Sequence, residues 1–466
     1  MQVVSTFVFS ALFLVPLVWE ALRQANAFRM DGQLFLNLSF SIVYGYTGLT
    51  YFSSGNPSGN LFLATQADSV SIVCATTYMF SILGYGLARQ MPLRTKFNYV
   101  DPDYRAIKWA AGVAFLVAVA ALTIYVMQYG GIGNALRYAA EIRAGYGESL
   151  LVGDGTFIFF KNLIPLGIYL PIVSFALFIR RRKYSDLLIA AASCCVLVVG
   201  LILMSGRGRI VIFFMLLAIC TISFASSRKR IPPVFLMVGP LIGLALDIFV
   251  TFGKKLFNSS YKDNVNYSDI LVLSDYVPFK VLADYYEHRI TSVVVALSYS
   301  EQHYTYFYDA LSLPLFVIPQ KVTGMVEPES ISYLNTYLQV GAWDSMIPPG
   351  LAAYGLYSLG VFGIAIVGFV FGFLPGMLDS ANFKEGCLGN PRILIRMPLL
   401  LIWIIYFFQG DPRVFATHLT PVLIFAVFYF VALRTVGKKN RNQWNPSFGQ
   451  AAENRRPSGA MAVMRN

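Results

Sequence analysis

Charged side chains are scarce in this sequence. Only 13% of its 466 residues are Asp, Glu, Lys or Arg, whereas 56% are hydrophobic. Soluble domains carry about 25% charged residues, and a water-soluble fold of this length needs polar surface that these residues cannot supply. The scarcity of charge excludes an ordinary soluble domain. It favours a membrane protein, whose apolar exterior is solvated by lipid.

Histidine and cysteine are also rare, with three and five residues. They form no cluster with metal-ligand spacing, so we expect no metal and no other cofactor. Four of the five cysteines lie in apolar runs, so we expect no disulfide. The net charge of +12 does not indicate nucleic acid, because the Lys and Arg residues occur in short clusters between apolar runs and not on a basic soluble domain.

Long apolar runs take the place of polar sequence. A bilayer-spanning helix needs about 20 mostly apolar residues, and such a run must be helical because its backbone groups find no water in lipid. About eleven segments qualify: 3–22, 33–52, 70–88, 106–128, 157–179, 186–204, 209–226, 232–252, 350–375, 394–409 and 417–436. The second is rich in Ser, Thr, Tyr and Gly and could face a cavity instead of lipid. The sequence predicts an all-α polytopic membrane protein.

The clusters of Lys and Arg predict the orientation of these spans. If the N-terminus lies outside and the C-terminus in the cytosol, most basic residues fall on the inner side, including 180–183 and 228–230. This distribution follows the positive-inside rule. Arg207 and Arg209 run against the trend, because they lie in a short turn that this topology places outside.

The spans divide the chain into four regions. Residues 1–252 carry eight spans, 253–349 form a large outer loop, 350–436 carry three more spans, and 437–466 form a polar, basic tail that we expect to be disordered in the cytosol. The loop is too aromatic and aliphatic for disorder, so we expect a folded cap with amphipathic helices. Seven glycines space out residues 350–376, and small residues let membrane helices pack closely.

Two outer turns carry arginines that could bind an anion. One is Ser205-Gly206-Arg207-Gly208-Arg209, where guanidinium groups could bind phosphate oxygens bidentately. The alternative is that these arginines extend to lipid head groups or to carbonyls at the helix ends. The other turn is Gly410-Asp411-Pro412-Arg413, followed by His418. Its alternative is an Asp411–Arg413 surface pair, which contributes little to stability.

The large loop contains a third candidate group. Asp284, Glu287 and His288 share one face of a predicted helix, and Arg289 lies on the adjoining face. Such a group offers both a general base and a cation. A solvated polar face is the alternative.

These features together resemble one family. The turn at 205–209, the large outer loop, and the run Pro349-Gly350-Leu351-Ala352-Ala353-Tyr354-Gly355-Leu356-Tyr357 with its continuation Gly360-Val361-Phe362-Gly363 are similar to the bacterial O-antigen and exopolysaccharide repeat-unit polymerases, the Wzy family. The resemblance covers most of the chain in topology but only short stretches in motif.

The resemblance implies a glycosyltransferase of the C-type fold in the bacterial inner (cytoplasmic) membrane, acting in lipopolysaccharide or exopolysaccharide biosynthesis. The N-terminus and the active site would be periplasmic. The substrates would be oligosaccharide units on undecaprenyl diphosphate, with membrane lipid around them and no nucleotide sugar. A flippase and a chain-length regulator would be the partners.

Glycosyl transfer from a diphosphate requires cations that stabilise charge on the leaving group. We therefore expect Arg207, Arg209, Arg289 and Arg413 to bind the diphosphate. A base must accept the proton of the acceptor hydroxyl, and the candidates, in falling order, are Glu287, His288 and His418. The carboxylates are not clustered, so a metal is unnecessary.

Two other functions remain open. An O-antigen ligase shares the donor but transfers finished chains to the lipid A core. A transporter or flippase of lipid-linked oligosaccharide would favour charges along several spans, two matched halves and short loops, and the long outer loop argues against it.

Overall fold

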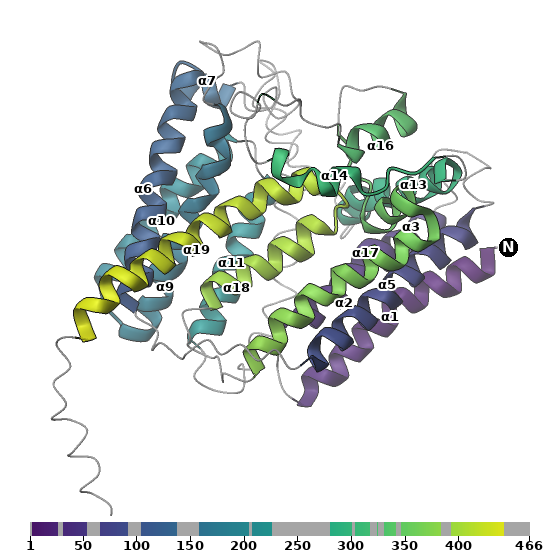
Figure 1. The fold of residues 1–466 in the computed structure, drawn as a ribbon, viewed down its shortest axis with the longest axis horizontal. Coiled ribbons are helices and arrows are strands. Elements are labelled where there is room, and N and C mark those ends of the chain that lie inside the picture. Colours follow the sequence, from purple (N-terminus) through teal and green to yellow (C-terminus); the bar gives the residue numbers. More distant parts are fainter. Residues whose placement is uncertain are drawn as a thin grey trace, which may run out of the picture.

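The computed structural model describes residues 2–26, 31–53, 66–91, 104–137, 158–204, 207–225, 280–300, 303–316, 324, 330–341, 346–383 and 393–441. Every regular element in these ranges is a helix (Figure 1). They are α1 (Gln2–Asn26), α2 (Gly32–Phe40), η1 (Ser41–Tyr46), α3 (Thr47–Ser53), α5 (Ala67–Gln90), α6 (Tyr104–Gln128), α7 (Ile132–Arg137), η3 (Ile158–Ile168), α9 (Tyr169–Arg181), α10 (Tyr184–Leu203), α11 (Arg207–Ala225), α13 (Lys280–Ser300), α14 (Tyr308–Leu311), η6 (Leu313–Phe316), α16 (Ile331–Val340), α17 (Leu351–Phe383), α18 (Ile393–Ile402), η7 (Trp403–Phe407) and α19 (Pro412–Arg441). The all-α prediction is confirmed for these ranges.

Seven helical stretches are long and apolar enough to cross a membrane. They are Val3–Gln24, Ala67–Gln90, Tyr104–Gln128, Phe160–Ile179, Tyr184–Leu203, Leu351–Ser380 and Pro412–Thr435. Large apolar side chains such as Phe7, Leu116 and Leu188 are exposed on them, on faces where a soluble helix would be polar. The fold is that of an all-helical, multi-pass membrane protein.

The other four predicted spans have different outcomes. Segments 209–226 and 394–409 contain shorter apolar helices, Arg209–Cys220 and Ile393–Phe407. Segment 33–52 is helical but interrupted, and segment 232–252 lies outside the described residues. Seven spans are therefore supported by length and composition, and the count of about eleven stays a prediction.

The polar second segment packs inside the protein. Asn37 and Ser41 are fully buried, and a Cβ added to Gly45 would lie 2.6 Å from the backbone of Phe13 in α1. A π-helical stretch, η1, separates α2 from α3, and such stretches occur frequently at functional sites. The segment faces neighbouring helices, so its Ser, Thr and Gly residues contact protein instead of lipid.

The predicted ninth span is two helices. Leu359 and Gly360 are non-helical, and Gly360 has φ +58°, a conformation that glycine adopts without steric cost. Residues 351–358 are all buried, and a Cβ added to Gly355 would lie 2.8 Å from Ile364. Residues 351–358 therefore form a short helix that packs against the start of the second helix. The second helix begins after the break at Leu359–Gly360.

Glycines in the second part of α17 pack against α5, as the sequence predicted. A Cβ on Gly368 would lie 2.7 Å from the carbonyl oxygen of Thr77, and one on Gly376 would lie 2.5 Å from that of Tyr85. Gly372 lies between them against Ser81. The two backbones therefore approach more closely than side chains would allow.

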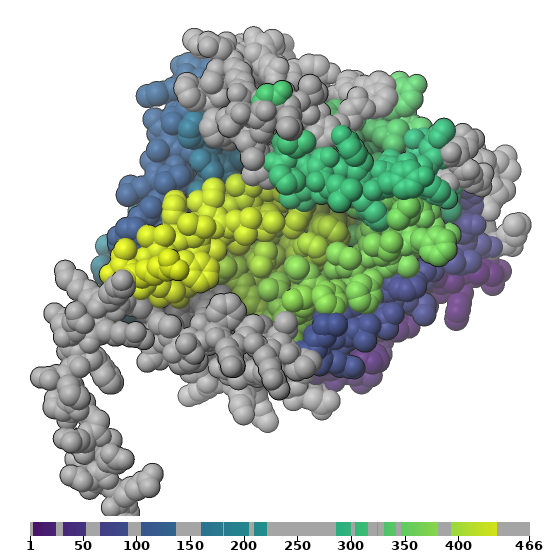
Figure 2. Space-filling view, in the orientation of Figure 1, coloured from purple at the N-terminus to yellow at the C-terminus, as the bar shows by residue number. Residues whose placement is uncertain are grey.

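Parts of the predicted cap are described, and they are folded. The helices α13, α14, η6 and α16 lie at one end of the bundle (Figure 1), and in Figure 2 the teal-green residues form a band over α17 and α19. Asn335 joins α16 to two other helices: its Nδ2 donates to Ser292 Oγ at 3.0 Å, and its Oδ1 accepts from the Tyr357 hydroxyl at 3.0 Å. The rest of 253–349 lies outside the described residues.

Ion pairs at the opposite end of the bundle join α1, α2, α17 and α18. Arg23 pairs with Glu20 and Asp31, and Arg396 lies 3.2 Å from Asp379. Asp379 also accepts the backbone N–H of Gly32 at 2.7 Å. These arginines occupy the end that the sequence assigns to the cytosol. The last helix continues to Arg441, five residues past the predicted boundary at 436, and 442–466 lie outside the described residues.

Candidate functional site

A main-chain clasp joins the starts of two membrane helices beneath the cap. Gly350 N–H donates to Gln409 carbonyl at 2.7 Å, and Leu351 N–H donates to Phe408 carbonyl at 3.0 Å. Gly350 and Gly410 have φ of +82° and +68°, which non-glycine residues rarely adopt. The start of α17 and the turn before α19 are therefore held together by backbone atoms. We call this contact the Gly350–Gln409 clasp.

Arg289 of α13 lies directly against this clasp. Its side chain is buried, with 4% of its surface exposed, and a Cβ on Gly350 would lie 3.3 Å from the Arg289 Cβ. The guanidinium lies over the rings of Tyr286 and Phe408, 4.7 and 5.7 Å from their centroids. Its Nε has no hydrogen-bond partner, and no carboxylate in the described part of the chain pairs with it.

Two π-helical stretches adjoin Arg289. Phe408 follows η7, and Tyr44 belongs to η1; their rings lie 5.3 Å apart. The Tyr44 hydroxyl accepts the Ala352 N–H at 3.0 Å. Phe408, directly after η7, and Tyr44 of η1 therefore both lie near the buried guanidinium of Arg289. Hydropathy alone does not reveal these π-helical stretches.

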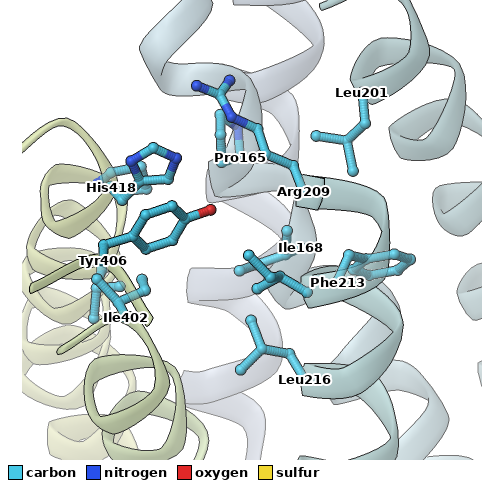
Figure 3. Close-up of a pocket in the computed structure, with 12 residues that line it drawn as sticks. Pro165, Ile168, Leu201, Arg209, Phe213, Leu216, Ile402, Tyr406 and His418 are labelled. Atoms are coloured by element: carbon cyan, nitrogen blue, oxygen red, sulfur yellow. The ribbon is translucent and has the colours of Figure 1, made fainter. Parts of the chain in front are cut away.

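Arg209 lines a small cavity of about 50 Å³ between η3, α11, α18, η7 and α19. Tyr406 and His418 lie across the cavity from Arg209 (Figure 3), and the remaining lining is apolar, including Ile212, Leu216 and Val422. Arg209 Nη1 also donates to Met204 Sδ at 3.7 Å. The cavity therefore has polar groups on two facing sides, and the rest of its lining is apolar.

The hydrogen bonds of His418 define its tautomer. Its Nδ1 lies 2.7 Å from the Val414 carbonyl oxygen, which can only accept, so Nδ1 carries a proton. The ring stacks on Tyr406 with centroids 3.6 Å apart. Nε2 is therefore the nitrogen that could accept a hydrogen bond from a ligand.

The structure brings together some of the predicted site residues. Arg209 and His418 share the cavity, and Arg289 lies against Phe408, two residues after Tyr406. Arg413 is half-buried at the start of α19, with its N–H bonded to Asp411 Oδ1 at 2.8 Å. All of these side chains therefore adjoin one stretch, 406–418, at the cap end of the bundle.

The remaining predicted residues are placed less completely. Glu287 and His288 are half-buried on α13 beside Arg289, and they are not the inward-facing residues of that helix. Arg207 begins α11, but its side chain and that of Asp284 lie outside the described residues. The diphosphate-binding set of four arginines therefore stays a prediction.

The sequence did not predict the burial of two carboxylates, Asp411 and Asp309. Asp411 is 1% exposed; it accepts from the Ser330 hydroxyl at 2.9 Å, from the Ser332 hydroxyl, and from the N–H of Arg413. It caps α19 and is not a surface partner of Arg413. The Asp-Pro step at a helix start was an available signal.

Asp309 of α14 is the other missed carboxylate, and it is 4% exposed. Its Oδ1 accepts from the Tyr354 hydroxyl at 3.1 Å and from Ala310 N–H at 2.9 Å. No pattern marked this residue, since a single acid in a Tyr-rich stretch carries no periodic signal.

No family model, curated protein or solved structure matches this chain.

The arrangement suits an amphiphilic anion at the membrane surface. Arginines offer paired donors to phosphate oxygens, and the cavity offers apolar contacts below Arg209. The cap helices α13, α14 and α16 lie at the same end of the bundle. Within the described ranges no three His, Cys, Asp or Glu side chains gather as a metal site.

Proposed function

We propose that this protein is a lipid-diphosphate-dependent glycosyltransferase that polymerises undecaprenyl-diphosphate-linked oligosaccharide units into O-antigen or exopolysaccharide. The reaction would occur on the periplasmic side of the bacterial inner membrane. It would need no nucleotide sugar, because the lipid diphosphate is itself the leaving group.

The burial of Arg289 with no carboxylate partner among the described residues carries this proposal. Removing a guanidinium from water costs several kcal/mol when nothing compensates its charge. Contact with two aromatic rings returns about 0.5–2 kcal/mol, which leaves part of that cost unmet. An anionic ligand would meet it, and a diphosphate matches the geometry of a guanidinium fork.

The Arg209 cavity supports the same substrate class. A polyprenyl diphosphate has a charged head and a long apolar tail, and the cavity has Arg209 facing Tyr406 and His418, with apolar side chains elsewhere. Arg209 and Arg289 would hold diphosphate oxygens, and the apolar wall would contact the first isoprene units. Such an amphiphile needs both kinds of surface at once.

In the proposed step, a hydroxyl oxygen of the acceptor sugar forms a bond to the anomeric carbon of the donor chain. The bond from that carbon to the diphosphate oxygen breaks, and its electron pair leaves with the diphosphate. Arginine donors stabilise the charge that develops there. The hydroxyl proton passes to a base, for which the sequence offered Glu287, His288 and His418.

We predict that Arg209→Ala leaves the protein in the membrane but yields polysaccharide of a single repeat unit. Removing one well-placed donor to the leaving group lowers the rate about a hundredfold, or roughly 3 kcal/mol. The measurement is the chain-length distribution in a deletion strain that expresses the variant, with its membrane level checked by immunoblot.

Arg105→Ala is the matched control, because Arg105 is exposed in the first turn of α6, at the end of that helix away from the cap. It should give long chains. Normal long chains from Arg209→Ala would remove Arg209 from the site. Accumulation of long chains on undecaprenyl diphosphate in the deletion strain would instead identify a ligase, and transport of labelled lipid-linked oligosaccharide into vesicles with no change in chain length would identify a transporter.

A further inference from the structure

The cap segment before α14 adopts an unusual backbone conformation. Tyr306 and Phe307 both have positive φ, 52° and 57°, which costs about 1–3 kcal/mol for a non-glycine residue and occurs often at functional sites. Two backbone hydrogen bonds hold the segment: Thr305 N–H to Tyr357 carbonyl at 2.8 Å, and Tyr306 N–H to Ser358 carbonyl at 3.0 Å. The cap segment is therefore attached to the buried first helix of α17.

This turn places Asp309 inside the protein. Phe307 packs on Tyr354, with ring centroids 5.6 Å apart, and two residues later the Asp309 carboxylate meets the hydroxyl of the same tyrosine. Tyr354 lies one helical turn after Gly350, the residue that contacts Arg289. The start of α17, with Gly350 before it, therefore contacts both Arg289 and the buried Asp309 carboxylate.

The two oxygens of Asp309 are used unequally. Oδ1 accepts two hydrogen bonds, from Tyr354 and Ala310. Oδ2 is buried and has no hydrogen-bond partner within the described part of the chain. Asp411, by contrast, accepts bonds on both oxygens. A buried carboxylate oxygen left open is costly, and it is available to accept a proton from a bound hydroxyl.

We propose that Asp309 is the base that accepts the proton of the attacking sugar hydroxyl, a role that rests on the proposed function. The Tyr354 hydroxyl and the Ala310 amide hold Oδ1 in place, and Oδ2 accepts the hydroxyl proton. The hydroxyl oxygen bonds to the anomeric carbon, and the diphosphate leaves with the electron pair of the broken C–O bond. Proton, nucleophile and leaving group are then all accounted for.

The electrostatic surroundings of Asp309 suit this role. Burial and the nearby Asp411 together raise the pKa of Asp309 to about 6, against the opposing effects of the Tyr354 hydroxyl and the nearby amides of Ala310 and Ile331. Among the described residues, the titratable groups that face it are Tyr354 of α17 and Asp411 at the start of α19, and neither is a cation. The carboxylate is ionised at neutral pH and basic enough to accept a proton. Below about pH 6 it is protonated, so the rate should fall as pH decreases.

The test uses the full-length protein in lipid nanodiscs, with lipid-linked oligosaccharide extracted from the deletion strain as both donor and acceptor. We expect Asp309→Asn to lower the elongation rate 10²–10⁴-fold while binding of the lipid-linked oligosaccharide changes little. The wild-type rate should show an acid limb near pH 6, which Asp309→Glu should retain with reduced rate and Asp309→Asn should lack. Asp411→Asn is the control for a structural role: the acid limb should persist in whatever activity it keeps.

The outcomes separate the two proposals. Wild-type protein that produces no elongation in this assay would overturn the polymerase proposal. Elongation by wild type together with an unchanged rate and acid limb in Asp309→Asn would overturn the role of Asp309 and leave the polymerase standing. If Asp309→Asn does not accumulate, the comparison of Asp309→Glu with wild type decides, because an unchanged elongation rate in Asp309→Glu would also overturn that role.

Discussion

Replacing Arg289 with methionine should abolish polymerisation while making the protein more resistant to heat. Methionine fills a similar volume and can pack against Tyr286 and Phe408, but it carries no charge. The elongation rate should fall at least a hundredfold, which corresponds to about 3 kcal/mol of lost transition-state stabilisation. The thermal midpoint should rise, because replacing buried ionic groups with well-packed apolar ones is often stabilising by about 1–4 kcal/mol.

A lower elongation rate together with a higher thermal midpoint distinguishes an arginine that binds a ligand from one held in a structural ion pair. Arg23 provides the matched control, since its guanidinium pairs with Glu20 and Asp31. Arg23→Met would leave two buried carboxylates without their partner, so the midpoint should fall, by the equivalent of about 3–5 kcal/mol. Thermal unfolding in detergent, followed by intrinsic fluorescence, measures both variants. A fall for Arg289→Met as large as that for Arg23→Met would contradict the account of Arg289 as an unpaired cation.

Replacing Gly372 with alanine should remove most of the protein from the membrane. The new Cβ would overlap the carbonyl oxygen of Ser81 in α5, and that oxygen belongs to the backbone and cannot move aside. Overpacking of this kind typically costs about 1–3 kcal/mol, and here it opposes a long helix–helix contact. The measurement is the amount of monodisperse protein recovered after extraction, by fluorescence-detected size-exclusion chromatography.

Gly86 lies on α5 itself and provides the control. A Cβ added there meets nothing within 4 Å, and alanine is the better helix former by about 1 kcal/mol. Gly86→Ala should therefore be recovered at least as well as wild type. Equal recovery of Gly372→Ala and Gly86→Ala would show that α5 and α17 are not in the close contact described here.

Hydropathy predicted the long helices well because their signal is local. Each needs only an uninterrupted apolar run, and Ala67–Gln90 and Tyr104–Gln128 match the predicted 70–88 and 106–128 within a few residues. It failed where a helix changes type or direction. The break at Leu359–Gly360 depends on a positive φ at Gly360 and on contact with Tyr304, and neither can be read from an apolar run.

The candidate site could be predicted from charge but not from burial. The sequence predicted Arg209 and His418 as polar residues beside membrane spans and Arg289 as part of a polar group on a loop helix. In the structure, Arg209 and Arg289 both lie against the stretch 406–418, which contains His418. That Arg289 is enclosed depends on how α13 meets the Gly350–Gln409 clasp. Asp309 could not be chosen, because its burial follows from two left-handed residues before α14 and from a partner 45 positions along the chain.

The Gly350–Gln409 clasp is made of peptide groups and glycine, so the frame around Arg289 does not depend on which side chains surround it. Side chains of the cap can be exchanged without altering the separation between the two helix starts. Under the proposed function, such a frame would let the sugars that are accepted change while the two helix starts beside Arg289 keep their separation, so acceptor preference and leaving-group chemistry could diverge independently.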